Sequence, residues 1–111
     1  MVLDLNGHTL TLTGDKDFII SAGVMEISDN SGTGLGTLNL NNNTGGIVVE
    51  YGYLQLNSGT INGDIHLPSV SDHGTPMFIM FGGTVNGNIL KAEVANFTRA
   101  GGTHNGEVIE Q

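Results

Sequence analysis

A short motif that occurs three times constrains this sequence more than any other feature. Residues 59–65 read Gly-Thr-Ile-Asn-Gly-Asp-Ile, and the pattern returns at residues 83–89 and again at residues 102–108. A second, longer similarity relates residues 19–28 to residues 48–57. Repeats of about 20 to 30 residues that contain only strand and turn signals predict a solenoid with one coil per repeat.

Alternating apolar and polar residues predict the strands of this solenoid. Period-two alternation, the signature of a strand with one buried face, runs through residues 9–13, 24–28, 37–41 and 53–57. Gly, Asn and Thr make up 41 of the 111 residues, a composition too poor in helix formers for long helices. We therefore predict one all-β domain over residues 1–111, a parallel β-helix of about four to five rungs. The polar, proline-flanked residues 68–76 are expected to leave it as a loop excursion.

An antiparallel β-sandwich is the alternative, because Asn-Gly pairs are strong hairpin signals and four of them occur in the chain. In a two-residue hairpin the residues that flank the turn face the same side of the sheet. Such hairpins would place Ile61 beside Asp64 and Val85 beside Asn88, which mixes apolar and polar side chains on one face. Alternation that continues through Asn62-Gly63 instead predicts that the four Asn-Gly pairs are strand positions or shallow corners in a coil.

One segment resembles a known superfamily. Residues 4–10, Asp-Leu-Asn-Gly-His-Thr-Leu, resemble the opening of right-handed parallel β-helix regions of the pectate-lyase-like superfamily. The Gly-Thr-Ile-Asn-Gly and Gly-Gly-Thr-Val-Asn-Gly strings look like the rungs of that class. The resemblance implies a right-handed parallel β-helix, as found in bacterial surface proteins and in phage tail or virion proteins. Its motifs report architecture and not activity.

Charge and cysteine content exclude several classes of partner and of chemistry. Eleven acidic and three basic residues give a formal net charge of −8, which disfavours nucleic acid and anionic membranes as partners. The absence of cysteine removes disulfides and thiolate chemistry. Apolar runs are far shorter than the roughly 20 residues of a membrane span, so no membrane insertion is expected. No signal peptide is predicted either.

Stacking of equivalent residues predicts the interior. We expect Ile61 over Val85 and Ile65 over Ile89. Two further columns are expected to hold Leu12 with Ile27 and Leu56, and Phe18 with Phe78 and Phe97.

The two ends of the coil are expected to differ. Polar His104 and Glu107 in the last repeat suit an end that faces solvent. The first coil begins at once, without a capping helix, and such an exposed end needs a cover. We therefore predict self-association into a homo-oligomer, or packing on another structural protein.

Carboxylates at equivalent repeat positions are the catalytic candidates. Asp64 and Glu107 align with Asn88 between them, which offers two carboxylates in one column, as a polysaccharide lyase or glycoside hydrolase would need. Four rungs offer little groove for a polysaccharide, and basic residues are few. Solvent-exposed positions on one face therefore explain Asp64 and Glu107 better, and no enzyme is predicted.

Oxygen-bearing turns are the candidates for metal binding. Asp15, Asp17 and Asp29 could supply oxygens to Ca²⁺, but no calcium-loop pattern surrounds them. Ordinary turn chemistry explains these residues better, and no cofactor is predicted.

Tyrosines are the candidates for contact with a ligand or a partner. Tyr53 precedes an inward residue and is expected to face outward, with Tyr51 beside it, where a glycan or a protein could pack. The leading hypothesis is a structural or adhesive module on a phage particle. The alternatives are part of a bacterial cell-surface adhesin and part of a carbohydrate-active enzyme, so the expected location is a virion or the cell surface.

Overall fold

Fifteen short strands in three parallel sheets make up the described part of the chain. The computed structural model describes residues 2–14, 18–20, 23–32, 35–41, 45–50, 52–68, 76–93 and 95–110. None of these residues lies in a helix, so no helix that could span a membrane occurs among them. Most of the predicted loop excursion, residues 69–75, lies outside the described residues.

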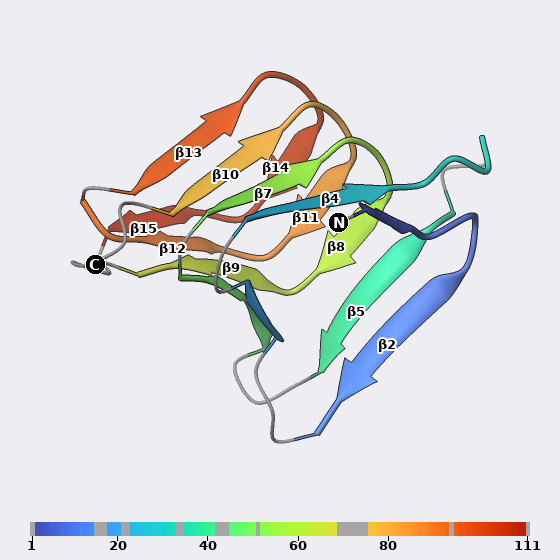
Figure 1. Cartoon of the computed structure of the whole chain (residues 1–111), viewed down its shortest axis with the longest axis horizontal. Helices are drawn as coiled ribbons and strands as arrows, with labels where there is room; N and C mark the ends of the chain where they lie inside the picture. Colours follow the sequence, from blue (N-terminus) through green and yellow to red (C-terminus); the bar gives the residue numbers. More distant parts are fainter. Residues whose placement is uncertain are drawn as a thin grey trace.

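Each sheet contains five strands, and consecutive strands of the chain belong to different sheets (Figure 1). Sheet A contains β1 (Val2–Asp4), β4 (Val24–Ser28), β7 (Tyr53–Leu56), β10 (Met77–Met80) and β13 (Asn96–Arg99). Sheet B contains β2 (Thr9–Thr13), β5 (Thr37–Asn41), β8 (Thr60–Asn62), β11 (Thr84–Asn86) and β14 (Thr103–Asn105). Sheet C contains β3 (Phe18–Ile20), β6 (Gly46–Val49), β9 (Asp64–Leu67), β12 (Ile89–Lys91) and β15 (Val108–Glu110).

Neighbouring strands in each sheet are three apart along the chain and run parallel. Every pairing between the described strands is parallel. This arrangement is consistent with a parallel β-helix, and it excludes the antiparallel sandwich for the described strands. Parallel neighbours need a long connection, which the two intervening strands provide here.

The sequence repeats correspond to the strand register. Ile61 is paired with Val85, and Val85 with His104, so the three copies of the motif lie side by side in sheet B. Ile65 and Ile89 are paired in the same way in sheet C. The longer similarity also holds, because Met25 is paired with Leu54 in sheet A.

Two predicted columns are wrong in part. Ile27 is paired with Leu56 in sheet A as expected, but Leu12 is paired with Leu40 in sheet B. The alternating pattern gave the correct side of each strand but not its sheet, because all three sheets share the same period of two.

The aromatic column is also shorter than expected. The rings of Phe78 and Phe97 stack at a centroid distance of 5.4 Å, whereas Phe18 is paired with Ile47 in sheet C. The prediction failed for Phe18 because the spacing of aromatic residues along the chain does not reveal to which sheet each one belongs.

The core is a set of inward columns along the three sheets. Fully buried residues include Leu38, Ile61 and Val85 from sheet B, together with Leu54 and Leu56 from sheet A. Each inward side chain packs on its equivalents in the neighbouring strands, so apolar surface is removed from water along the whole stack.

The Asn-Gly pairs do not form hairpins, but they are not all alike. Asn62 ends β8, and Gly63 turns the corner into β9 at a φ of 155°. Asn6 and Gly7 instead form a tight turn at φ values of 48° and 77°, in which His8 N donates to Leu5 O. That turn joins β1 to β2 in a different sheet, so the prediction of a shallow corner is wrong at this one pair.

A substitution that creates a cavity tests whether the inward columns form a packed core. Ile61 is completely buried between Leu38 and Val85, so Ile61→Ala leaves a gap that its neighbours cannot fill. We expect the free energy of unfolding to fall by about 2–5 kcal/mol in denaturant titrations. Thr98→Ala, at an exposed position in β13, is the control and changes it by less than about 0.5 kcal/mol. A similar small loss for both variants would contradict the stacked core.

Candidate functional site

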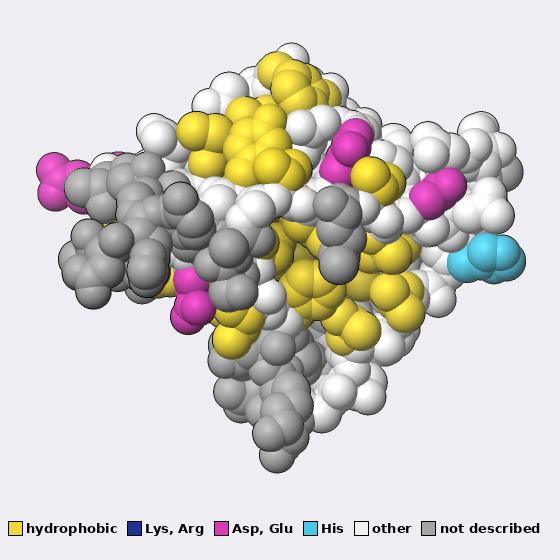
Figure 2. Space-filling model, viewed as in Figure 1, with side chains coloured by type: hydrophobic (Ala, Val, Ile, Leu, Met, Phe, Trp, Pro, Cys, Tyr) yellow, Lys and Arg dark blue, Asp and Glu magenta, His cyan; other side chains and the backbone are white. Residues whose placement is uncertain are grey.

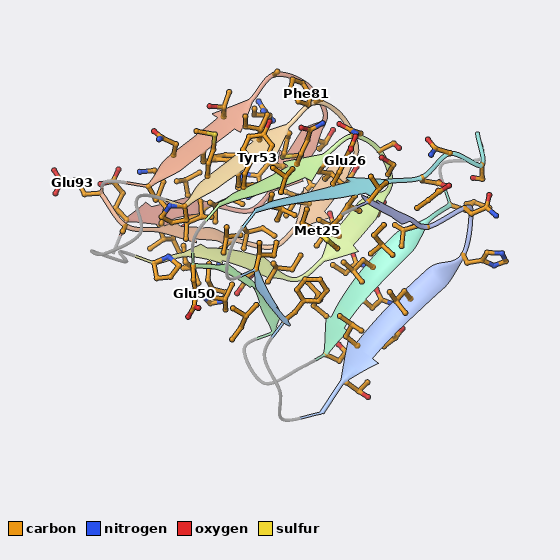
Figure 3. The ribbon with its side chains drawn as sticks, viewed as in Figure 1. Met25, Glu26, Glu50, Tyr53, Phe81 and Glu93 are labelled. Atoms are coloured by element: carbon orange, nitrogen blue, oxygen red, sulfur yellow. The ribbon has the colours of Figure 1, made fainter. Side chains whose placement is uncertain are left out.

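The outer face of sheet A carries a connected polar network. Tyr53 Oη donates to Gln55 Oε1 at 3.0 Å, and Gln55 Nε2 donates to Asn57 Oδ1 at 2.8 Å. Asn57 Nδ2 then donates to the Glu26 carboxylate and, at 3.3 Å, to Ser28 Oγ. Tyr53 and Glu26 project from the neighbouring strands β7 and β4 (Figure 3). The bonds hold a tyrosine ring and a carboxylate in fixed positions on one surface.

Apolar side chains lie next to this network. Val24 and Phe81 are each 53 % exposed. Met77 and Ile79 are half-buried on the outer side of β10, and Met77 is paired with Tyr53. Figure 2 shows hydrophobic side chains gathered over this part of sheet A. We call Tyr53, Met77, Ile79 and Phe81, with the network that begins at Tyr53, the sheet A patch.

Of the two tyrosines predicted to contact a ligand or partner, the structure describes only Tyr53. Tyr53 is half-buried on the outer side of β7, whereas Tyr51 lies outside the described residues. Sequence reasoning missed Glu26, Gln55 and Asn57. Their signal was present, because alternation puts Glu26 and Gln55 on the outer side, and the longer of the two sequence similarities places them in register.

The predicted carboxylate column is formed at a corner between sheets B and C. Asp64 Oδ1 accepts a hydrogen bond from Asn88 N at 2.9 Å, and Asn88 Oδ1 accepts one from Glu107 N at 3.1 Å. Each side chain therefore binds the backbone of the equivalent residue in the next strand-to-strand corner. Asp64 and Asn88 act here as corner braces. Glu107 is the exposed last member of the column.

Asp29 is a second corner brace, at the turn that follows β4. It is buried, and its Oδ1 accepts bonds from Gly7 N at 2.8 Å, Ser31 N at 3.2 Å and Ser31 Oγ at 2.7 Å. Its Oδ2 accepts one from Gly36 N at 2.9 Å. These bonds, led by the one from the Ser31 hydroxyl, lower the pKa of Asp29 from 3.8 to about 2, because they favour the ionised form.

The Asp29 bonds tie together segments that are far apart in the sequence. Gly7 belongs to the turn between β1 and β2, whereas Ser58 follows β7. Ser58 Oγ accepts from Asp29 N at 2.7 Å and donates to Asp29 O. The carboxylate oxygens of Asp29 are thus directed at protein donors rather than at an open site.

The other two metal candidates, Asp15 and Asp17, lie outside the described residues. Within the part of the chain that the structure describes, no three His, Asp or Glu side chains come close enough to hold a metal ion.

Two histidines lie in very different surroundings. His66 is on the outer side of β9, paired with Val48 and Leu90, and its buried Nε2 atom has no hydrogen-bond partner. His104 is on the inner side of β14, where Nε2 is 2.9 Å from Gly87 O and the ring meets Phe97 edge-on at 5.8 Å.

The two ends of the stack differ in the polarity of their inner side chains. The N-terminal end is formed by the edge strands β1, β2 and β3, whose inner side chains are Leu3, Leu10, Leu12, Phe18 and Ile20. Leu10 is 38 % exposed, although its register partner Leu38 is completely buried. Figure 2 shows the apolar surface between β1 and β2 at this end.

The C-terminal end, formed by β13, β14 and β15, is mixed at the equivalent inner positions: Phe97 and Val108 are apolar, whereas the other three inner residues are polar or charged. Arg99 is paired with Met80, His104 with Val85, and Glu110 with Lys91. Lys91 Nζ and Glu110 Oε1 are 3.7 Å apart. Charged side chains at inner positions of an edge discourage pairing with another chain, so this end is protected while the N-terminal end is not.

Comparison with protein-family models, curated proteins and solved structures found no match for this chain.

Titration of Asp29 tests its role as a corner brace. Because its pKa in the folded chain is about 2 and its ordinary value is 3.8, the ionised carboxylate stabilises the fold fully above pH 3.8. That stabilisation is lost as the pH falls from 3.8 to about 2. Asp29→Asn should therefore flatten the dependence of unfolding free energy on pH in this range, measured by urea titrations at several pH values.

Asp64→Asn is the matched control for that experiment, since among the described residues the Asp64 side chain accepts one backbone bond. An unchanged pH profile for Asp29→Asn would show that the Asp29 carboxylate does not brace the turn.

Proposed function

We propose that this chain is a non-enzymatic structural or adhesive β-helix module that associates with a second copy of itself through its N-terminal end. One observation carries the proposal: the inner side chains of β1, β2 and β3 are all apolar, and all except Ile20 are partly exposed, with Leu10 38 % exposed. An open apolar interior with three free strand edges gains stability when it is covered.

Complementarity favours a second copy in one orientation. Contact between two N-terminal ends pairs apolar surface with apolar surface, and a two-fold axis makes such a contact self-complementary and closed. Contact between an N-terminal and a C-terminal end that continues the register would instead place Leu3 against Arg99, and the apolar inner residues of β3 against the strand that ends in Glu110. Burying those charges without partners is costly, so an open filament is disfavoured.

The finer architecture is part of this proposal. Three strands, one from each sheet, make one coil, so that the five strands of each sheet correspond to five coils of a right-handed β-helix similar to the pectate-lyase-like superfamily. Support comes from the parallel, in-register sheets and from the opening motif at residues 4–10. A rigid rod of this kind suits a virion component, with a bacterial surface adhesin as the alternative setting.

The oligomeric state of the whole chain is the test. Light scattering after gel filtration should give twice the 11.6 kDa chain mass at micromolar concentration and above. Leu10→Glu places a charge in the proposed contact and should yield a monomer.

Val108→Glu is the matched control, because Val108 is 45 % exposed at the opposite end and should leave the dimer intact. A wild-type chain that stays monomeric at high concentration would overturn the proposal, as would dissociation by Val108→Glu rather than by Leu10→Glu. Circular dichroism establishes that each variant is folded.

A second candidate function is adhesion to a glycan through the sheet A patch. Phe81 offers an exposed ring, and Tyr53 is tied through Gln55 and Asn57 to the Glu26 carboxylate, so apolar and hydrogen-bonding groups meet on one surface. These are the groups that a sugar, with one apolar face and a rim of hydroxyls, would contact.

Binding to immobilised neutral and amino-sugar polysaccharides tests this candidate. Phe81→Ala should weaken binding about tenfold, the loss of roughly 1.4 kcal/mol of ring contact. Ile19→Ala, which removes an apolar side chain that is 47 % exposed on sheet C, should have no effect. Equal binding by both variants would remove the sheet A patch from consideration.

A further inference from the structure

The outer face of sheet B carries two regular columns of uncharged polar side chains. The first is threonine on all five strands: Thr9, Thr37, Thr60, Thr84 and Thr103. The second continues from Thr11 through four asparagines: Asn39, Asn62, Asn86 and Asn105. We call these ten residues the Thr/Asn face.

Charge is excluded from this face with unusual consistency. The chain contains eleven acidic and three basic residues, yet none of them occurs in the five strands of sheet B. Carboxylates begin only beyond the glycine corners, at Asp64 and Glu107. No aromatic ring stands on the outer side of these strands either, since His104 is on the inner side.

The asparagines are held in place by one another. Nδ2 of Asn62, Asn86 and Asn105 donates to Oδ1 of the preceding asparagine in the column, at 2.7, 2.8 and 2.9 Å. Asn39 Nδ2 in turn donates to Thr11 Oγ1 at 3.4 Å. Each amide has two N–H donors and two acceptor positions, so the ladder uses one of each and leaves the others for an outside partner.

The threonine column offers its hydroxyls in the same way. Within the described residues, the hydroxyls of Thr60, Thr84 and Thr103 have no hydrogen-bond partner in the protein, whereas Thr37 Oγ1 donates to Leu35 O. Each threonine presents a methyl group beside its hydroxyl. The face therefore combines donors, acceptors and small apolar groups at fixed points.

Backbone geometry sets the spacing of these points. Neighbouring strands are about 4.8 Å apart, and residues i and i+2 of one strand are about 6.8 Å apart. Because the register is unbroken over five strands, the ten side chains form a two-dimensional lattice. Side-chain ladders of this kind also resist the twist that would bend a sheet out of plane.

A regular array of polar side chains binds best to a ligand whose own polar groups repeat at matching distances. The ligand must be uncharged, must offer both donors and acceptors, and must repeat in two directions. The surface of an ice crystal meets all three conditions, since every water molecule in it donates and accepts and its oxygen rows repeat at comparable distances. A fixed array of polar groups also lowers the entropic cost of ordering water.

We propose that the Thr/Asn face of sheet B binds the surface of ice. Sugars are less well matched here than on the sheet A patch, because no ring is present for stacking. Nucleic acids and other anions are disfavoured because the five strands of sheet B contain no Lys or Arg. This face consists of outward side chains, whereas the proposed contact at the N-terminal end uses inward ones, so the inference does not depend on the proposed self-association.

Inhibition of ice recrystallisation by the full chain is the test, together with the shape of single ice crystals grown in its presence. The wild-type chain should keep ice grains small and produce faceted crystals. Thr60→Lys and Thr84→Lys place a long charged side chain in the middle of the lattice and should abolish both effects. Thr98→Lys is the matched control, because it makes the same change on the outer side of sheet A and should keep full activity.

Additional variants keep the test decisive. Should Thr60→Lys fail to fold by circular dichroism, Thr103→Lys makes the change on the edge strand β14, where the side chain is exposed, and should also abolish activity. Leu10→Glu should retain ice activity whatever its oligomeric state, since Leu10 is an inner residue of β2.

Three results would overturn the inference. One is a wild-type chain that leaves ice growth unchanged. Another is equal ice activity in Thr60→Lys and Thr98→Lys, because binding would then lie elsewhere. The third is binding of soluble cello-oligosaccharides to the Thr/Asn face without any effect on ice, which would identify a sugar as the occupant.

Discussion

Parallel stacking in strict register is the constraint on which the rest of this molecule depends. A side chain in one strand lies next to its equivalent in the following repeat, as Ile61 does with Val85. Like residues therefore accumulate in columns. Inside, the columns are apolar and dry; outside, the same register converts single asparagines into a continuous hydrogen-bonded ladder. One geometric rule thus produces both the core and the surfaces that present chemistry.

The turns between strands are stabilised by glycines and by polar side chains. Glycines allow the chain to turn where backbone segments approach closely; a Cβ on Gly87 would lie 2.0 Å from Gly63 O. Side-chain oxygens complete the turns, with Asp64 and Asn88 binding the next corner and Asp29 gathering donors from three segments. Two of the acidic residues that attract a catalytic or metal-binding interpretation, Asp64 and Asp29, are engaged in this bracing.

The exposed side chains differ in kind from one surface of the molecule to the next. Sheet A combines aromatic and apolar groups with a hydrogen-bonded carboxylate, sheet B is uncharged and periodic, and only one of the two ends carries charged inner side chains. Apolar Leu10 and Phe18 lie at one end, and Arg99 and Glu110 occupy inner positions at the other. Such a division allows one rigid body to pack on a second copy at an end while its sides stay free for other contacts. Because the separate proposals use different residues, each can fail without the others.

The sequence alone determined the parallel stacking, because the motif at residues 59–65 recurs in phase and its alternation runs unbroken through Asn-Gly. It also identified the inner column of Ile61, Val85 and His104 and the pairing of Ile65 with Ile89. The tertiary structure decided which sheet each strand joins, since a period of two is the same in all three sheets, and so Leu12 and Phe18 were assigned to the wrong columns. It also decided what the polar side chains do: whether Asp29 accepts four protein donors or faces solvent depends on Gly7 and Gly36, which the linear pattern does not bring together. Local periodicity fixes which side of a strand a residue occupies, whereas its partners depend on how far the chain turns at every corner.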